Sequence, residues 1–364
     1  MKNLSVIGIG RLGLCFALTL EKSGFNVVGV DIVKEYVDKI NDKTFASVEP
    51  HVNGTLARSK NLHATIDLKK AVDHGELIFV TVRTESEPDG KYDVSQVDSV
   101  VDSLVELGKQ QDKKHLVICS NVNPGYSNTV ADRLNNLNWT VSFNPETVAQ
   151  GTILYNQSYP DCVYIGAESN EIAHAIEKVY EKVCMNSPIV HTMDRLSAEL
   201  TKVSMNCFLT VKISFANMVG DIASKIGANP HSVLNAVGSD SRINNKFFRY
   251  GFGWGGPCFP RDTRAFIRLA ELNEMPADLC IASNSINDKH LDFQYQQYAA
   301  EYDVSETIFF DSVTYKPGTN IIEESQQLKL AVRLARNGRD VVISDSPEVQ
   351  EIVKEKYGDL FRYE

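Results

Sequence analysis

The most reactive arrangement of residues in this 364-residue chain lies in one short glycine-rich segment. Cys258 stands between two prolines in the run GFGWGGPCFPRD, which ends with Arg261 and Asp262. A thiol with a pKa of about 8.5 is only about 3% ionised at pH 7, but glycines let a substrate approach the backbone and a nearby cation favours the thiolate. The segment predicts a nucleophilic cysteine; the alternative is an inert turn cysteine in the core.

Three further polar residues stand where catalysis would need them. Lys202 and Asn206 are four residues apart in a long helical pattern, so they share one helix face and could together hold an oxyanion or an alcohol oxygen. The alternative is a lysine that extends to the surface at a domain boundary. Glu146 follows a predicted strand in FNPETV, where parallel-sheet enzymes place their sites. For this residue the alternative is a solvated loop carboxylate.

The N-terminal segment carries the spacing of a dinucleotide-binding turn. Three glycines fit the pattern G-x-G-x-x-G: Gly8, Gly10 and Gly13. They lie between a predicted strand, Leu4–Ile7, and a predicted helix, Leu12–Ser23, and would let a pyrophosphate approach the start of the helix. The next predicted strand, Phe25–Val30, ends at Asp31, whose carboxylate could accept hydrogen bonds from an adenosine ribose. The pattern predicts an NAD site and favours NAD over NADP.

The elements around these residues predict an α/β fold. Apolar runs alternate with helical patterns up to about residue 192, which indicates a parallel sheet with helices on both faces. A long helix is predicted from Arg195 to Lys225, and a shorter strand-helix-strand unit begins near Glu306. We therefore expect two doubly wound, Rossmann-like domains joined by a long central helix, with the C-terminal domain short. The predicted boundaries are 1–192 for the NAD-binding domain, 193–300 for a central helical and dimerisation region with the cysteine loop, and 301–364 for the short domain.

The composition restricts the class of partner. A net charge of −10, from 37 basic and 47 acidic residues, argues against a nucleic-acid partner. There is no run of 18 apolar residues and the start MKNLSVIGIG is already strand-like, so neither a membrane span nor a signal peptide is expected. Seven cysteines without paired spacing are typical of the reducing cytoplasm. No cluster of metal-ligand residues stands out, and no metal is expected.

Taken together, the motifs resemble the UDP-glucose/GDP-mannose dehydrogenase family over nearly the whole chain. Six segments carry the resemblance in the family's order: GIGRLG with Asp31, FNPE at 143–146, KVSMNCFLTVKISFAN at 202–217, SRINNKFF at 241–248, GFGWGGPCFPRD at 251–262 and YKPGT at 315–319. The resemblance implies an NAD-dependent homodimer that oxidises a nucleotide sugar by four electrons. It favours UDP-glucose, oxidised to UDP-glucuronate, and it implies that residues 301–364 bind the nucleotide sugar.

The resemblance also implies a role for each site residue. Cys258 would carry a thiohemiacetal and then a thioester, Lys202 and Asn206 would stabilise oxyanions, Asp262 would orient or activate water, and Glu146 would act as a base in hydrolysis. The implied cofactor-binding residues are Gly8, Gly10, Arg11, Leu12, Gly13, Asp31 and Ser120. The implied substrate-binding residues are Thr147, Arg242, Lys246, Phe247, Arg249, Gly255 and Lys316, with Arg242 reaching a neighbouring subunit.

The chain departs from the family pattern at several positions. Asn121 replaces a threonine close to the catalytic water, and Gln150 replaces a second acid after FNPE. Glu323 replaces an arginine near the cofactor phosphates, Met218 replaces a glutamate, and the sequence stops early, at Glu364. Two alternatives therefore stay open. One is a dehydrogenase of another nucleotide sugar, such as UDP-N-acetylmannosamine or GDP-mannose, and the other is a nucleotide-binding homologue with weak or lost activity.

Overall fold

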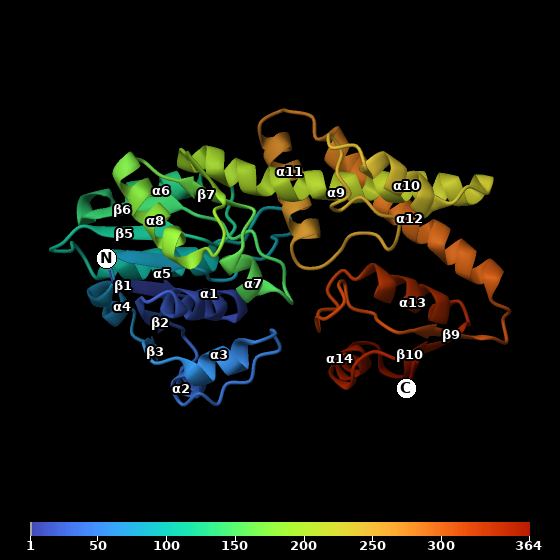
Figure 1. Ribbon diagram of the computed structural model, residues 1–364, viewed down its shortest axis with the longest axis horizontal. Coiled ribbons are helices and arrows are strands. Elements are labelled where there is room, and N and C mark those ends of the chain that lie inside the picture. The colour runs from blue at the N-terminus through green and yellow to red at the C-terminus, as the bar shows by residue number, and fades with distance from the viewer. Residues whose placement is uncertain (1) are drawn as a thin grey trace. The chain divides into compact units, whose positions relative to one another are not determined.

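A computed structural model describes residues 2–364 of the chain (Figure 1). The chain divides into two units, residues 2–202 and 203–364, and the boundary falls inside the long helix α9, Arg195–Ile226. The division into three domains at residues 192 and 300 stays a prediction. Each unit is described below by itself.

The N-terminal unit is built on an eight-stranded sheet in the order β3-β2-β1-β4-β5-β6-β7-β8. The strands are β1 Asn3–Ile7, β2 Asn26–Val30, β3 Leu62–Thr65, β4 Leu77–Val80, β5 Lys114–Ile118, β6 Trp139–Phe143, β7 Cys162–Gly166 and β8 Ile189–Met193. Strands β1 to β6 are parallel, in the order typical of dinucleotide-binding domains.

The sheet departs from the expected all-parallel arrangement at one edge. β7 pairs with β6 in the antiparallel sense, through Phe143 and Gly166, while β7 and β8 are parallel to each other. Parallel pairing requires a crossover, usually a long helix on one face of the sheet. The connection after β6 is mostly loop, with only the six-residue helix α7, Ile153–Ser158, so the chain returns in the opposite direction.

Helices cover both faces of this sheet, which explains why its central strands β1, β4, β5 and β6 are buried at nearly every position. The helices of the unit are α1 Arg11–Lys22, α2 Lys34–Asn41, α3 Val52–Arg58, α4 Leu68–His74, α5 Ser95–Glu106, α6 Tyr126–Leu134, α7 and α8 Asn170–Val183, with a 3-10 turn at Asn135–Leu137. In β4, Leu77 and Phe79 pack into the core shared with α1 and α8, whereas Ile78 and Val80 pack into the core shared with α5 and α6.

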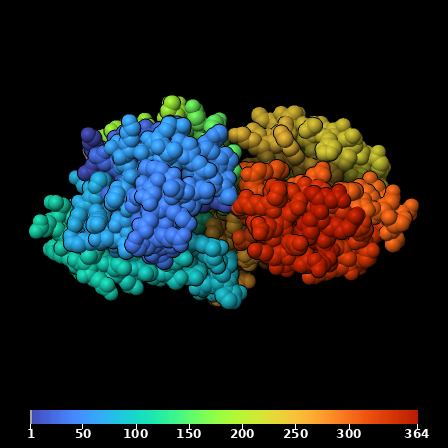
Figure 2. Space-filling view, turned by 90° about the horizontal axis from the view of Figure 1, so that it is seen from below, coloured from blue at the N-terminus to red at the C-terminus, as the bar shows by residue number. Residues whose placement is uncertain are grey.

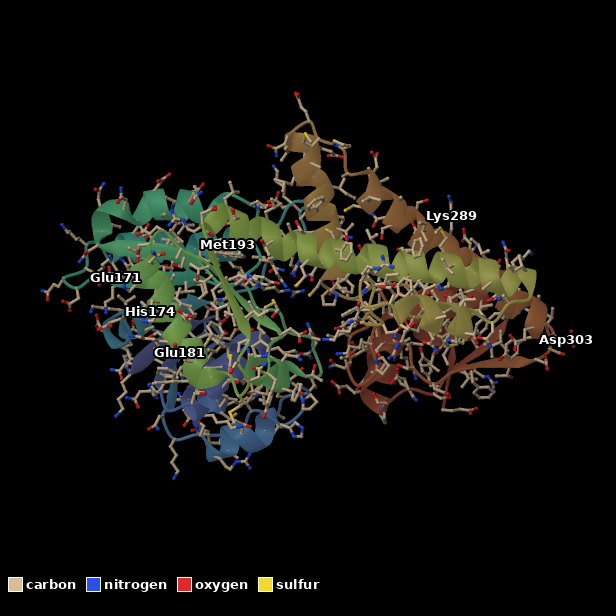
Figure 3. All side chains as sticks on the ribbon, turned by 45° about the horizontal axis from the view of Figure 1, so that its top comes forward. Glu171, His174, Glu181, Met193, Lys289 and Asp303 are labelled. Atoms are coloured by element: carbon tan, nitrogen blue, oxygen red, sulfur yellow. The ribbon has the colours of Figure 1, made fainter. Side chains whose placement is uncertain are left out.

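Helix α8 shows how one sequence pattern gives two faces. Ile172, Ile176 and Val179 recur at helical spacing and are buried. The polar residues Glu171, His174 and Glu181 are exposed and extend from the outer side of the helix (Figure 3). The helix begins after Ser169, whose hydroxyl accepts a hydrogen bond from the Ile172 backbone N–H.

The C-terminal unit combines helices with a three-stranded parallel sheet in the order β11-β10-β9. Its elements after α9 are α10 Pro230–Gly238, α11 Phe259–Leu272, α12 Asp278–Glu301, β9 Thr307–Phe310, α13 Gln326–Arg336, β10 Asp340–Ile343, α14 Pro347–Tyr357, a 3-10 turn Gly358–Leu360 and β11 Arg362–Tyr363. Ile308, Leu330 and Val353 lie in its core, and the space-filling view shows the surface formed by its last segments in red (Figure 2). The predicted fold class is confirmed, including the short second doubly wound unit. No helix within residues 2–364 is both long and apolar enough to cross a membrane.

Candidate functional site

The glycine-rich turn after β1 has the geometry of a dinucleotide cradle. Gly8 has a φ of +86°, and its N–H donates to the Val30 carbonyl at 2.8 Å. A Cβ at Gly13 would lie 2.1 Å from the Gly8 carbonyl oxygen, so only glycine permits this packing of α1 on the turn. Gly10 is exposed, and nothing lies within 4 Å of a Cβ placed there. A pyrophosphate could therefore reach the first backbone amides of α1, those of Arg11 and Leu12.

The neighbouring strand ends supply the other groups that a dinucleotide needs. Asp31 directly follows β2, is partly exposed, and accepts from the Val33 N–H through Oδ1 at 3.1 Å, which leaves Oδ2 for a ribose hydroxyl. The Ser120 hydroxyl donates to the Val82 carbonyl at 2.6 Å and so ties the ends of β4 and β5 together. These residues fit NAD, whose nicotinamide would accept hydride when bound. The predicted cofactor-binding residues lie along one edge of the parallel strands.

Glu146 lies in the loop between β6 and α7 of the same unit. Burial raises the pKa of its carboxyl to about 7, and the Gln157 amide and the Lys202 ammonium offset part of that rise. Lys202 itself is 8% exposed. The loop is held by Glu49, a buried residue that the sequence analysis missed. Its carboxylate accepts from the backbone N–H groups of Gly151 at 3.0 Å and Ile153 at 2.9 Å, at the start of α7.

Cys258 lies in the C-terminal unit, at the residue immediately before α11. Its side chain is exposed, and its carbonyl accepts the Asp262 N–H at 2.8 Å, so the two residues are one helical turn apart. Asp262 is completely buried. Its Oδ2 accepts from Asn206 Nδ2 at 2.5 Å, and its Oδ1 lies 3.2 Å from Arg261 Nε. The structure thus brings together three of the predicted catalytic residues within this unit.

Polar side chains of α12 and α9 hold the glycine-rich loop before Cys258. The Asn287 amide accepts from the Trp254 N–H and donates to the Trp254 carbonyl, both at 3.0 Å, as a neighbouring strand would. Asn217 of α9 accepts from the Gly251 N–H at 3.1 Å, and His290 Nε2 lies 2.6 Å from the Gly251 carbonyl. The sequence analysis missed these three residues. For Asn287 and His290 the signal was the recurrence of polar residues at helical spacing on the buried side of α12: Ser283, Asn287 and His290.

The other six cysteines are more shielded than Cys258. Burial raises the pKa of Cys15 to about 12 and of Cys184 to about 11, and it raises the pKa of Cys119 well above its ordinary value. Cys207 is buried beside Cys280, and the neighbouring thiol and burial together raise its pKa. Cys258 is the one exposed cysteine of the seven, all of which the structure describes. Exposure is what a nucleophilic thiol requires.

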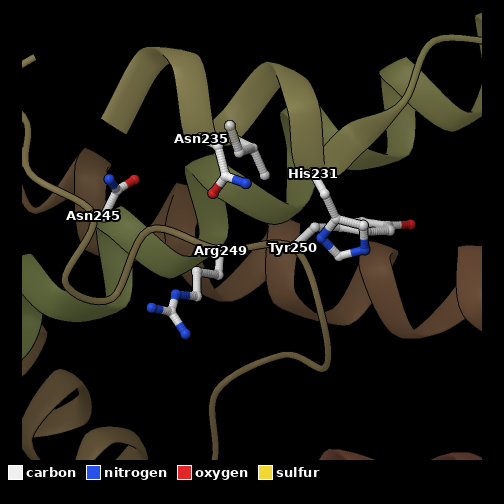
Figure 4. Close-up of a pocket in the computed structure, with 6 residues that line it drawn as sticks. His231, Asn235, Asn245, Arg249 and Tyr250 are labelled. Atoms are coloured by element: carbon white, nitrogen blue, oxygen red, sulfur yellow. The ribbon is translucent and has the colours of Figure 1, made fainter. Parts of the chain in front are cut away.

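The predicted substrate-binding residues are spread over both units. Phe247 is 49% exposed, with a φ of +60°, and Arg242 is exposed and paired with Asp240 at 2.7 Å. Arg249 lines a cavity of about 500 Å³ in the C-terminal unit (Figure 4), together with His231, Leu234, Asn235, Asn245 and Tyr250. Thr147 lies beside Glu146 in the N-terminal unit. Lys246 is exposed, Gly255 is buried and Lys316 is partly buried. Within residues 2–364, no three His, Cys, Asp or Glu side chains are grouped so that they could hold a metal ion.

The fold and these residues define a class: a dinucleotide-dependent dehydrogenase with an exposed cysteine. Comparison with known proteins narrows the class. The profile of the UDP-glucose/GDP-mannose dehydrogenase family, NAD binding domain, matches residues 2–184, and the profile of that family's central domain matches residues 196–289. The chain therefore belongs to the UDP-glucose/GDP-mannose dehydrogenase family. The predicted family, enzyme class and cofactor are confirmed: it is an NAD-dependent nucleotide-sugar dehydrogenase.

Individual relatives agree with this assignment. The UDP-glucose 6-dehydrogenase of Rhizobium meliloti is 30% identical over 96% of this chain and 82% of its own, and UDP-glucose 6-dehydrogenase AglM of Haloferax volcanii is 29% identical over 98% and 86%. A UDP-glucose dehydrogenase structure from Pyrobaculum islandicum superposes with a TM-score of 0.90 at 29% identity, covering 100% of this chain and 86% of that one. The GDP-mannose 6-dehydrogenase of Pseudomonas syringae pv. tomato is 28% identical over 94% and 81%, so overall identity does not separate the substrates.

Proposed function

We propose that the protein oxidises the primary alcohol of UDP-glucose to the carboxylate of UDP-glucuronate, in two hydride transfers followed by hydrolysis at Cys258. The observation that carries this proposal is the hydrogen bond from Asn206 to Asp262, one turn after Cys258 on α11. It fixes a buried carboxylate and a buried amide beside the backbone that presents the exposed thiol. Relatives at 29–30% identity that are named UDP-glucose 6-dehydrogenases support this choice of sugar.

The covalent steps follow from the chemistry of the thiol. The first hydride leaves the alcohol carbon as the hydroxyl gives up its proton, the Cys258 sulfur adds to the resulting aldehyde, and the thiohemiacetal oxygen takes up a proton. Loss of the second hydride, together with the hydroxyl proton of the thiohemiacetal, gives a thioester. The start of α11 favours negative charge, so the helix supports a thiolate at Cys258 both as nucleophile and as leaving group. Lys202 and Asn206 would stabilise the oxygen as charge develops on it.

Hydrolysis requires a base that is partly ionised at neutral pH. Glu146 meets this requirement, because its pKa of about 7 leaves roughly half of the carboxyls ionised there. In the last step Glu146 takes a proton from water, the water oxygen attacks the thioester carbon, and the carbon–sulfur bond breaks. Asp262 would orient this water.

Positive residues would bind the diphosphate of the substrate. Arg242, Lys246 and Arg249 lie in one exposed segment of the C-terminal unit, and Lys316 lies in the loop after β9. Phe247 and Gly255 would line the sugar pocket, and Arg242 would act across a subunit boundary. Thr147 is also proposed to bind the substrate. A net charge of −10 makes such local cations necessary for an anionic substrate.

The proposal includes a homodimer formed through α9. Within the C-terminal unit, apolar side chains of this helix are exposed at heptad-like spacing: Phe208, Phe215, Ile222 and Ile226. Such a stripe is typical of a surface that another chain covers.

We also propose that the protein prefers NAD over NADP, since the Asp31 carboxylate would repel a 2′-phosphate. Equal catalytic efficiency with both cofactors would contradict that preference.

One assay tests the substrate. The purified protein is incubated with NAD and, separately, with UDP-glucose, UDP-N-acetylmannosamine and GDP-mannose, while NADH is followed by absorbance. The expected result is turnover of UDP-glucose with two NADH per sugar. Turnover of only another sugar would reassign the substrate. Binding of UDP-glucose and NAD without NADH formation would instead indicate a nucleotide-binding homologue that has lost activity.

A further inference from the structure

The glycine-rich loop before the reactive cysteine, residues 251–256, packs against a turn of the same unit. This turn, residues 323–326, ends at the start of α13. The Gly256 N–H donates to the Glu323 carbonyl at 3.1 Å. The Gln326 side chain, which is 3% exposed, donates through Nε2 to the carbonyl of the loop's tryptophan at 3.3 Å. Two hydrogen bonds therefore hold the loop on the turn.

Two glycines of the loop leave no room for a side chain at this contact. A Cβ placed on Gly255 would lie 2.1 Å from the Glu324 carbonyl oxygen, and one placed on Gly256 would lie 2.4 Å from the Tyr315 ring. A backbone oxygen cannot rotate away as the end of a side chain can, so alanine at position 255 would push the loop and the turn apart. By contrast, a Cβ on Gly251 would meet no atom within 4 Å in the described part of the chain, its chain neighbours aside.

Glu324 gives the turn the shape that this contact needs. Its φ of +51° lies in the left-handed region, which persists at a residue other than glycine only where the surrounding structure fixes it. Its carboxylate lies 2.6 Å from the Lys329 ammonium and 3.8 Å from the guanidinium of Arg264 on α11. All three side chains are partly exposed, so these ion pairs contribute little. The backbone of Glu324, against Gly255, is therefore the part of the residue that fixes the loop.

We propose that Glu324 is a positioning residue for Cys258, and that the thiol is held at the start of α11 only while the glycine-rich loop lies on the turn 323–326. The turn belongs to the connection between β9 and α13, which also carries Lys316. If Lys316 binds the diphosphate of the substrate, one connection both binds the substrate and positions the nucleophile. That last step rests on the proposed function, whereas the positioning of the thiol rests on contacts within the C-terminal unit.

The first experiment changes the loop side of the contact and measures the thiol without substrate or cofactor. The φ of Gly255 lies outside the left-handed region, so only the contact with the turn opposes Gly255→Ala. The rate of alkylation of Cys258 by iodoacetamide is measured against pH by peptide mass spectrometry. The midpoint should rise toward that of a free thiol, about 8.5, because the displaced loop no longer holds the sulfur at the start of the helix. Gly251→Ala, in the same loop, should leave the midpoint unchanged.

A matched pair of substitutions tests the turn side. Glu324→Gly and Glu324→Val both remove the carboxylate, but only glycine adopts the left-handed φ without strain. Glu324→Val should therefore raise the alkylation midpoint, and Glu324→Gly should leave it unchanged. A loss of global stability alone, measured by urea unfolding, would not move the midpoint. If Gly255→Ala does not fold, this pair decides.

The proposal fails if the contact can be broken without an effect on the thiol. An unchanged midpoint in folded Gly255→Ala or in folded Glu324→Val would overturn it. Equal shifts in Glu324→Gly and Glu324→Val would also overturn it, because the carboxylate and not the backbone would then hold the loop.

The kinetic arm separates this inference from the proposed function. With UDP-glucose and NAD, Glu324→Val should have a kcat about tenfold or more below that of Glu324→Gly, because a small misplacement of the nucleophile is costly, with the same dissociation constant for NAD. Equal kcat values in the two variants would overturn the positioning role. A shifted midpoint in Glu324→Val, together with no oxidation of any of the three nucleotide sugars by the unaltered protein, would uphold the positioning of the thiol and reject the proposed function.

Discussion

At the scale of single residues, the two carboxyls of the site differ in the surroundings in which each is buried. Burial places the pKa of Glu146 near neutrality, while Asp262, which is completely buried, is held by Asn206 and Arg261. Two acids of similar intrinsic strength thereby acquire different environments. Glu146 can exchange protons at neutral pH, which suits the proposed role of base in hydrolysis. Asp262 is fixed by hydrogen bonds, which suits the proposed role of orienting water.

Replacing Cys258 tests the covalent route. In Cys258→Ser the hydroxyl is a far poorer nucleophile than a thiolate, so complete oxidation should fall by at least about a thousand-fold, while NAD binding persists. Product analysis and NAD titration check both points. Normal formation of UDP-glucuronate by the serine variant would exclude a thioester at this residue.

Replacing Glu146 tests the base and has a second effect on stability. Glu146→Gln should release NADH in a burst of two per site and then stall as a sugar-nucleotide adduct that intact-protein mass spectrometry detects. Because folding raises the pKa of this carboxyl from 4.5 to about 7, the unaltered protein loses about 3 kcal/mol of stability as the pH rises through that window. Urea unfolding should therefore show that the glutamine variant gains stability relative to the unaltered protein at pH 8 but not at pH 4. Steady turnover of the Glu146→Gln variant at the normal rate would contradict the proposed role of Glu146 as the base in hydrolysis.

At the scale of elements, the sequence predicts what is periodic or tightly spaced. The turn of Gly8 to Gly13, the strands that follow it and the long helix α9 were predictable because glycine spacing and apolar recurrence directly reflect backbone geometry. The antiparallel edge at β7 was not, because strand direction depends on how a mostly irregular connection returns. Glu49 and Gln157 also escaped prediction, since their partners are distant in sequence and a single buried polar residue leaves no pattern.

The contact between α12 and the cysteine loop gives an element-level prediction. Asn287→Ala would leave both the N–H and the carbonyl of buried Trp254 without partners, at a cost of about 2 kcal/mol or more. The loop should loosen, so activity should fall by more than the loss of folded protein explains. Asn284→Ala, on the same helix, is the matched control, because the side-chain oxygen of Asn284 has no partner to lose. If the two variants have the same free energy of unfolding in urea and the same rate of turnover, the proposal that Asn287 holds the cysteine loop is wrong.

At the scale of the whole molecule, the exposed stripe on α9 carries the prediction of assembly. Phe215→Glu or Ile222→Glu would place a charge among the exposed apolar side chains of this helix. Either variant should shift a dimer toward monomers in sedimentation velocity at micromolar concentration, because burying an unpaired carboxylate at an interface is costly. Gln296→Glu, at an exposed position of α12, should leave the association state unchanged. A monomeric, fully active unaltered protein would contradict the proposed dimer.

The hydrogen bonds of the cysteine loop have a consequence for its dynamics. Residues 251–256 belong to no helix or strand, yet the amide protons of Gly251, Trp254 and Gly256 have acceptors in Asn217, Asn287 and the Glu323 carbonyl. Amide hydrogen exchange follows such protection rather than secondary structure. These three amides should exchange with deuterium at the slow pace of strand amides, so the segment that presents the thiol is rigid before any substrate arrives.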